Sequence, residues 1–496
     1  MEFRALLICL VTTAAVVTPG CFKDYLGSDE TVPESGADAS SDASSAGEAC
    51  TPRCSDDQRS ILCAGGVADA AQPCALGCVD GPRCAALDPE GPATVDDYAN
   101  ASANVHLYGP DASDAGGIYI LNTDNGSISS GIRTANGVDA LKDGERVSLA
   151  GISMRTARQP KLVDGGAESP EIAIFGFRSL HVAEGATLRI IGTRAAALIT
   201  REAMEIDGLI DADCDQSSYS AVPRAYSTAG PGGYGPADND SPGRGGDSSA
   251  SSKNCNVGYD TCVGGGGGGG HGTSGGMGGK ATNSIPGAAG EKRTRSEVFI
   301  LLGGSSGGFP APNAVGGNSF PGAGGGAVQL GSSGLLRIGA RGVVSAAGCG
   351  GGVGTSIKGG GGGGGGGAGG MIVLEAGRIE LAPNAVIAAN GGGGAPGSSN
   401  EIAAGGDGER GRHDDQPASG GLTISTNSDN SDAGCRGGNG GTLNAATAGE
   451  DSPFIASTRI GGGGGGAAGR ILVRGELISA GATISPGPDV AEPTKR

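Results

Sequence analysis

Runs of consecutive glycine constrain the fold of this chain more than any other feature of its sequence. The longest runs are 264–270, 359–367 and 461–466, and glycine accounts for 103 of the 496 residues, roughly three times its usual share of about 7%. Glycine loses more conformational freedom on folding than any other residue and has no side chain to bury. The runs therefore cannot supply a hydrophobic core, which must come from the segments between them.

The glycine runs have two structural interpretations. In the first, they are flexible, solvated loops. In the second, they stack as extended threefold glycine helices, close enough for backbone hydrogen bonds because no Cβ intervenes, by analogy with collagen-like chains. The sequence has no strict Gly-X-Y period, which excludes a collagen triple helix. The solvated loop is the simpler interpretation, and it is the one that we predict.

The segments between the runs repeat a short apolar pattern. In each copy an aliphatic residue is followed, after three residues, by a block of small and aliphatic side chains. The copies begin at Val182, Ile338, Leu381 and Ile478, and a shortened relative spans 204–212. Apolar residues near these starts stand two apart with a polar residue between them, as in Ile379-Glu380-Leu381. Such alternation over so few residues is typical of short, half-buried strands.

Repetition of one unit is typical of a stacked architecture, in which each unit completes the core of its neighbour. We therefore predict an all-β chain with a parallel β-helix or β-solenoid-like repeat core and long glycine-rich loops. A β-sandwich is the alternative. Aromatic residues make up only 3% of the chain and Trp is absent, which predicts a thin aliphatic core. Leu381 and Ile387 are expected to point inward and Glu380 outward.

The N-terminal segment is typical of an export signal. An apolar stretch spans 5–17, which is signal-peptide length and too short to cross a bilayer comfortably. Small residues precede Cys21, and this resembles the lipobox of bacterial lipoproteins, which is cleaved before a cysteine that carries diacylglycerol. Thr18 and Pro19 depart from that pattern, and an ordinary secretory signal is the alternative. Phe22 stands where the enterobacterial inner-membrane sorting pattern has Asp, which favours the outer membrane.

Six cysteines follow within a short stretch. They predict a small module held by three disulfides, with fifteen possible pairings, because the chain is exported and the module is too small to be stabilised by burial alone. A metal site is the weaker alternative, since the cluster contains no His. These residues are Cys50, Cys54, Cys63, Cys74, Cys78 and Cys84.

Five further cysteines lie in the rest of the chain. Because their number is odd, we expect one thiol to be left over, and Cys255 and Cys262 could close a loop beside the first glycine run. The five are Cys214, Cys255, Cys262, Cys349 and Cys435.

Composition divides the chain into six parts. We predict a lipoprotein signal peptide at 1–20, an acidic Ser/Ala-rich tether at 21–49, the cysteine module at 50–84, a mixed β region at 85–170, the glycine-rich β repeat domain at 171–489 and a tail at 490–496. The tether has too few large apolar residues to fold.

Motifs that carry chemistry are sparse. The segment 304–308 matches G-x-S-x-G, but Phe309 and Pro310 follow it, and they cannot start the helix that a nucleophile elbow requires. Asp211, Asp213 and Asp215 are interpreted as a solvated turn, with a calcium site as the alternative. The four histidines are far apart in sequence, and His413 is interpreted as part of a solvated loop tip. We predict no catalytic residue, no metal site and no cofactor.

Taken together, the lipobox, the tether and the glycine-flanked apolar blocks resemble glycine-rich surface lipoproteins of Gram-negative bacteria with β-solenoid cores. The resemblance implies a lipid-anchored structural or adhesive protein of the outer membrane or the extracellular surface. The formal net charge is −18, which argues against nucleic acid as a partner. The expected partners are the membrane, through the lipid anchor, and an extracellular polysaccharide or a cell-surface protein. The alternative function is a polysaccharide-acting β-helix enzyme, a lyase or hydrolase that uses the acidic cluster near Asp211.

Overall fold

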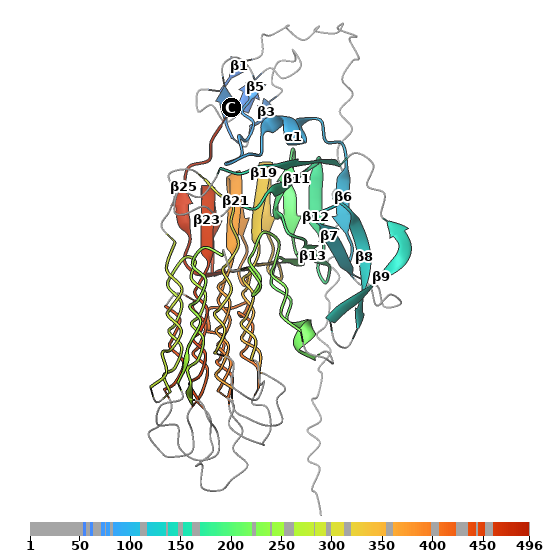
Figure 1. The fold of residues 1–496 in the computed structure, drawn as a ribbon. Helices are drawn as coiled ribbons and strands as arrows, with labels where there is room; N and C mark the ends of the chain where they lie inside the picture. The colour runs from blue at the N-terminus through green and yellow to red at the C-terminus, as the bar shows by residue number, and fades with distance from the viewer. Residues whose placement is uncertain are drawn as a thin grey trace, which may run out of the picture. The chain divides into compact units, whose positions relative to one another are not determined.

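The structure, a computed structural model, describes residues 53–495 with gaps (Figure 1). The export signal, Cys21 and the tether lie outside the described residues. A boundary between compact units falls between Glu48 and Ala49. The internal gaps are 56–59, 63–70, 75, 80–82, 110–116, 135–136, 147–151, 161–168, 221–224, 239–240, 252–261, 282, 294–298, 312–318, 354–360, 398–405, 423–434, 443–444 and 452–459.

The cysteine module consists of short antiparallel strands and disulfides. Disulfides join Cys54 to Cys78 and Cys74 to Cys84, so the pairing that the sequence left open is given for these four. Cys50 and Cys63 lie outside the described residues. The strands are β1 (Arg53–Cys54), β2 (Ser60–Leu62) and β3 (Ala71–Pro73) in one sheet, and β4 (Cys78–Val79) with β5 (Arg83–Cys84) in another.

The described chain is mostly β, with two large sheets and very little helix. The first sheet is parallel except for the pair β10–β11. Its longest path runs through β10 (Ser153–Ala157), β11 (Ile172–Phe177), β14 (Ala195–Thr200), β19 (Ala327–Ile338), β15 (Met204–Ile206), β12 (Ser179–Val182) and β6 (Asn104–Leu107). Three more strands continue from β19: β21 (Met371–Leu381) pairs with β19, β23 (Arg470–Ser479) with β21, and β25 (Asp489–Ala491) with β23.

The second sheet is parallel from β24 to β7 and ends in antiparallel β8 and β9. Its strands are β24 (Thr483–Ser485), β22 (Val386–Ala388), β20 (Val343–Ser345), β16 (Leu209–Asp211), β13 (Thr187–Ile191), β7 (Ile118–Asn122), β8 (Ile128–Thr134) and β9 (Gly137–Arg146). The remaining elements are α1 (Val95–Ala99), η2 (Ser217–Ser220), and the pair β17 (Ala250–Ser251) and β18 (Cys262–Val263).

The repeated skeleton places equivalent residues beside one another. Val182 pairs with Ile206, Ile206 with Ile338, and Ile338 with Leu381. These side chains and those of the second sheet, such as Ile387, form one aliphatic core between the sheets. Leu381 is 2% exposed and Ile387 is fully buried, whereas Glu380 is only partly buried. The predicted inward and outward positions are therefore confirmed.

The last copy of the skeleton differs from the prediction by one residue. Leu381 pairs with Ser479, and Ile478 pairs with Glu380, so Ile478 points outward and is 39% exposed. The cause is a register shift between Glu375 and Arg378, opposite which β23 has one residue fewer. Leu477 packs against the core instead.

The sheets also extend beyond the predicted repeat domain. β6 and β7, from the region predicted as mixed β, already pair in register with β12 and β13. The segment predicted as a tail contains most of β25, which pairs with β23. On the outer face of the first sheet, α1 contributes Tyr98 to a second apolar cluster with Ile172, Ala197 and Met371.

The chain leaves the second sheet after β16, β20 and β22 in long glycine-rich segments that return to β19, β21 and β23. In Figure 1 these segments extend away from the ends of the strands as closely spaced lengths of chain. The described parts of the three longest runs are buried. The predicted solvated loops are therefore wrong, and the alternative of ordered, stacked glycine segments describes the structure.

Backbone hydrogen bonds join the three longest runs in a closed cycle. The amide of Gly266 donates to the carbonyl of Gly363, Gly363 to Gly461, and Gly464 to Gly266, at 2.9 to 3.0 Å. The same bonds recur three residues further along the runs. We call these three runs and the segments bonded to them the glycine bundle. A repeat of three residues is that of a threefold extended helix.

The bundle requires glycine because neighbouring backbones approach without room for a side chain. A Cβ added to Gly365 would overlap the carbonyl oxygen of Gly267, and one added to Gly463 would overlap that of Gly364. Successive residues of one run face different neighbouring segments of the chain, and every third residue faces the same segment. In this way Gly363, Gly366 and Gly369 face the carbonyls of Ala395, Gly392 and Ala389, while Gly364, Gly367 and Gly370 face those of Phe320, Ala323 and Gly326.

Candidate functional site

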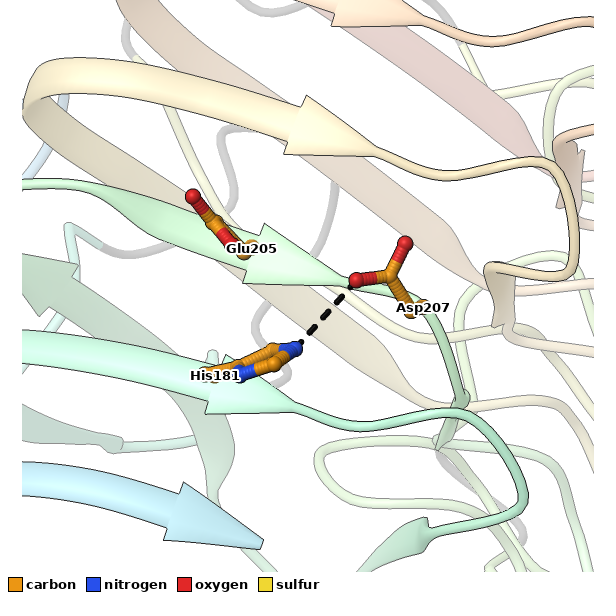
Figure 2. Close-up of side chains that lie close together, drawn as sticks. All are labelled: His181, Glu205 and Asp207. Atoms are coloured by element: carbon orange, nitrogen blue, oxygen red, sulfur yellow. Dashed lines mark hydrogen bonds and ion pairs between the residues drawn. The ribbon is translucent and has the colours of Figure 1, made fainter. Parts of the chain in front are cut away.

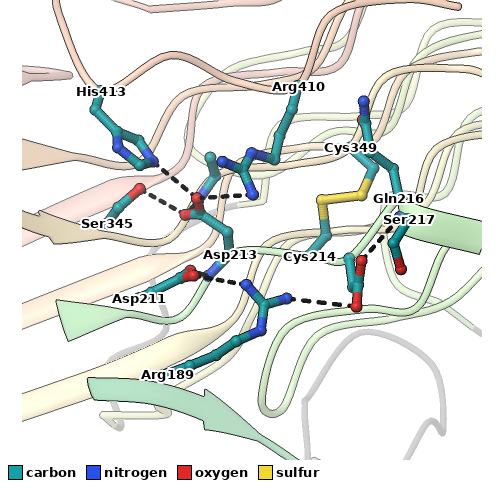
Figure 3. A network of polar contacts seen from close by, with 12 residues as sticks. Arg189, Asp211, Asp213, Cys214, Gln216, Ser217, Ser345, Cys349, Arg410 and His413 are labelled. Carbon is teal, nitrogen blue, oxygen red and sulfur yellow. Dashed lines mark hydrogen bonds and ion pairs between the residues drawn. A yellow bond between two sulfur atoms is a disulfide. The ribbon is translucent and has the colours of Figure 1, made fainter. Parts of the chain in front are cut away.

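The acidic residues at the end of β16 and just after it form a polar network with basic residues from distant segments (Figure 3). Arg189 on β13 pairs in register with Asp211 on β16, and its guanidinium donates to the Asp211 carboxylate at 2.6 Å. The same guanidinium lies 3.7 Å from Asp215. Because both strands are parallel and adjacent, their outward residues meet at the point where the chain enters the glycine bundle.

Asp213 is the centre of this network. Its Oδ1 accepts hydrogen bonds from the Ser345 hydroxyl at 2.5 Å and from the Ala347 amide at 2.6 Å. Its Oδ2 lies 2.8 Å from His413 Nε2 and 3.6 Å from the guanidinium of Arg410. The Asp213 side chain is completely buried. This carboxylate thus joins the chain just after β16 to β20 and to His413, which lies 200 residues further along the chain than Asp213.

Charge pairing shifts the pKa values of both partners. Burial acts to raise the pKa of Asp213, but the charges of Arg410 and His413 outweigh it, so that the pKa lies well below its usual range. Burial acts to lower the pKa of His413, but the Asp213 carboxylate outweighs it, so that the pKa is raised. The pair is therefore stabilised in its ionised form.

Further contacts fasten the same region. A disulfide joins Cys214 to Cys349, so that the first and second glycine-rich segments are linked where they leave the second sheet. After β22, the Asn390 side chain donates to the carbonyls of Arg412 and Asp414, both at 2.7 Å. The solvated turn and the solvated loop tip predicted for Asp213 and His413 are wrong, because these residues bind each other.

The network lacks the arrangement of a nucleophilic triad. The Ser345 hydroxyl donates to Asp213 rather than to His413, so these three residues do not form the serine-to-histidine-to-aspartate chain that activates a nucleophile. Ser306 of the G-x-S-x-G segment is completely buried, and the segment lies inside the glycine bundle, where Gly307 donates to Gly322. No helix follows it among the described residues.

A second polar cluster lies on the outward face of the first sheet (Figure 2). His181 on β12 stands directly opposite Glu205 on β15, and Asp207 follows just beyond the end of β15. The ligand atoms of these three side chains lie within 4.8 Å of one another. His181 Nε2 is 3.2 Å from Asp207 Oδ2. The sequence did not reveal this cluster, because its residues lie far apart in the chain. Aligning the repeated strands would have placed His181 opposite Glu205, as the structure does.

Two more residues border this cluster. His106 on β6 pairs with His181, and their Nδ1 atoms are 3.1 Å apart. Burial and the charge of His181 lower the pKa of His106. Arg337 on β19 lies 3.6 Å from Glu205 and 3.2 Å from Asp207.

A shallow groove of about 1110 Å³ lies between the turn that contains Asp124 and the segment 226–238. Its lining residues include Tyr226, Tyr234, Asp124 and Asp238. Tyr226 is 47% exposed. The Asp238 carboxylate accepts a hydrogen bond from the Gly235 amide at 2.6 Å.

Among the other residues that the sequence singled out, Cys262 is disulfide-bonded and Cys435 is a free, buried thiol. Cys21 lies outside the described residues. No helix in the described part of the chain is long and apolar enough to cross a membrane. Comparison of the chain with protein-family models, with curated proteins and with solved structures found no match.

Proposed function

We propose that this chain is a lipid-anchored structural or adhesive protein of the bacterial envelope, carried at the outer membrane or on the cell surface, and that it is not an enzyme. The observation that carries the proposal is the glycine bundle. Its backbone hydrogen bonds recur every three residues, and the three glycine runs at its centre have no side chains that could hold a reacting group. Such an element suits a scaffold or spacer better than an active site.

The core of the protein is, on this proposal, β-solenoid-like. Each passage of the chain through both sheets is one coil, and equivalent residues of successive coils pair directly, as Ile338 does with Leu381. In such a stack each coil completes the core of its neighbour. The stack then serves as a base from which the glycine bundle extends.

Cysteine usage supports a place outside the cytoplasm. Disulfides persist mainly in oxidising compartments, and the structure contains them both in the cysteine module and between Cys214 and Cys349. The signal-like segment before Cys21 agrees with export.

The proposed partners are the membrane, through a lipid on Cys21, and an extracellular polysaccharide or a cell-surface protein. The groove beside Tyr226 supports a polysaccharide, because aromatic faces pack against the apolar faces of sugars and carboxylates accept hydrogen bonds from their hydroxyls. The alternative of a polysaccharide-acting enzyme has less support. Asp213, at the centre of the acidic cluster, is completely buried and ion-paired, so its carboxylate is closed to a substrate.

The anchor is tested by Cys21→Ser, with Cys9→Ser in the same signal segment as the matched control. We expect the Cys21 variant to lose palmitate labelling and to leave the outer-membrane fraction, because the acceptor thiol is gone. Cells that carry it should also adhere less to polysaccharide-coated surfaces. The Cys9 variant should behave as the wild type. Unchanged labelling and fractionation of the Cys21 variant would contradict the lipid anchor, and equal adherence would contradict an adhesive role.

A further inference from the structure

The His181 cluster combines the ligand types that a transition metal requires. It offers one imidazole and two carboxylates, from His181, Glu205 and Asp207. His181 and Glu205 are held opposite each other by the register of β12 and β15, and Asp207, just beyond the end of β15, is held by its amide, which donates to the carbonyl of Val182 at 2.8 Å. The three side chains are partly exposed, at 27 to 40%, so an ion can reach them from solvent.

The distances in the cluster suit a tetrahedral ion. Zinc binds nitrogen and oxygen ligands at about 2.0 to 2.2 Å, which separates two tetrahedral ligand atoms by about 3.4 Å. His181 Nε2 and Asp207 Oδ2 are 3.2 Å apart. Glu205 lies within 4.8 Å of both, so its carboxylate has to move by about 1 Å to complete the set, which rotation of the long Glu side chain provides. Water would be the fourth ligand.

His106 is placed to orient the imidazole ligand. Its Nδ1 faces the Nδ1 of His181 at 3.1 Å, so one of the two nitrogens must donate and the other must accept. When His181 Nε2 binds a metal, the remaining ring proton is on Nδ1 and is donated to His106. A hydrogen bond of this kind, from the second nitrogen of a metal-binding histidine, fixes the ring and its tautomer.

We propose that His181, Glu205 and Asp207 form a binding site for a divalent transition-metal ion of the zinc class, with His106 as the residue that positions His181. The site goes beyond the structural or adhesive role and does not depend on it. The imidazole nitrogen selects zinc-class ions against calcium and magnesium, which prefer oxygen ligands. Arg337 opposes binding, because its guanidinium already pairs with both carboxylates.

The site is tested by titrating zinc into the untagged, purified full-length chain in a calorimeter, with cobalt absorption spectra as a second measurement. The wild type should bind one ion in a saturable step that excess calcium does not suppress. His181→Ala should weaken binding at least tenfold, and His106→Ala about tenfold. Arg337→Gln should strengthen binding, because it removes a competing cation. His413→Ala, which removes a histidine paired to a different carboxylate, is the matched control and should bind zinc as the wild type does.

Several outcomes would overturn the proposal. These are no saturable zinc binding by the wild type, equal affinity in the wild type and the His181 variant, and weaker binding in the Arg337 variant. Cobalt bound with the weak absorption of an octahedral complex would also contradict the tetrahedral site. Circular dichroism of each variant shows whether weaker zinc binding results from unfolding or from removal of the metal-binding side chain.

Discussion

Asp213 shows how one side chain can hold three distant parts of this chain. Its carboxylate accepts hydrogen bonds from β20 and from His413, and it lies near Arg410. A completely buried charge is costly unless it is paired and hydrogen-bonded, and here both conditions are met. The network therefore acts as a clamp at the point where the glycine-rich segments leave the second sheet.

Asp213→Asn should destabilise the protein by about 3 kcal/mol, because it leaves the charges of His413 and Arg410 without their buried partner. The amide keeps an oxygen that can accept from Ser345 and Ala347, so the protein should still fold. Urea unfolding measures the difference, and Asp414→Asn is the control, because Asp414 is next to His413 but half-exposed and paired with the half-exposed Arg412. A loss as large in Asp414→Asn as in Asp213→Asn would contradict the clamp.

The same variant has a predicted pH signature. The lowered pKa of Asp213 gives stability above its ordinary value of 3.8 that is lost as the pH falls toward the folded value. The raised pKa of His413 gives stability below its ordinary value of 6.5 that is lost as the pH rises through the folded value. The difference between wild type and Asp213→Asn should therefore be largest between about pH 4 and pH 6.5 and shrink on either side.

At the scale of elements, the three glycine runs form an assembly that is held by backbone hydrogen bonds and has no side chains of its own to pack. Each run donates to one neighbour and accepts from another at every third residue. The entropic cost of ordering glycine is large, and the cooperative backbone bonds, together with close contact between the chains, offset it. The requirement at buried positions is steric, so a single methyl group is enough to test it.

Gly365→Ala should lower the free energy of unfolding by about 1 to 3 kcal/mol, as overpacking does in other tightly packed sites. The added Cβ would overlap the carbonyl of Gly267 and separate two runs. Gly406→Ala is the matched control, because a Cβ there meets nothing within 4 Å. Thermal unfolding of both variants measures the contrast. Equal melting temperatures would mean that the runs do not pack as described.

At the scale of the whole molecule, the sheets and the glycine bundle are joined in one compact unit, 49–496. The Cys214–Cys349 disulfide links the first two glycine-rich segments across a separation of 135 residues. A bridge that closes so long a loop removes much conformational freedom from the unfolded chain. It therefore contributes to the stability of the whole unit rather than to one strand pair.

The double variant Cys214→Ala/Cys349→Ala should lose about 2 to 4 kcal/mol of stability, and protease should cut the glycine-rich segments faster because they are no longer tied at their base. The comparison is made by chemical unfolding and limited proteolysis under non-reducing conditions. Cys435→Ala, which removes a buried thiol that forms no bridge, is the control. Wild-type stability in the double variant would show that the bridge is dispensable.

The sequence by itself determined the strands and their inward faces. The alternation at Ile379-Glu380-Leu381 is local, because the side chains of a strand point to opposite faces in turn, and copies aligned by that pattern pair in register. The exception, Ile478, depends on a register shift in β23. The segment carries one sign of the shift, Gly475, which has a φ of +147° at that point, but a glycine within a strand does not give the register against the neighbouring strand.

Only the tertiary structure decided whether the glycine runs are solvated or packed, and which residues come together in the two polar clusters. A glycine run carries no pattern that distinguishes a solvated loop from a packed helix, since the outcome depends on whether other runs lie close enough to bond to it. Asp213 and His413, or His181 and Asp207, meet because parallel strands and long excursions bring distant residues to one place. Spacing in the sequence predicts contacts within one strand or helix. The contacts in the two polar clusters join different elements, which only the folded chain brings side by side.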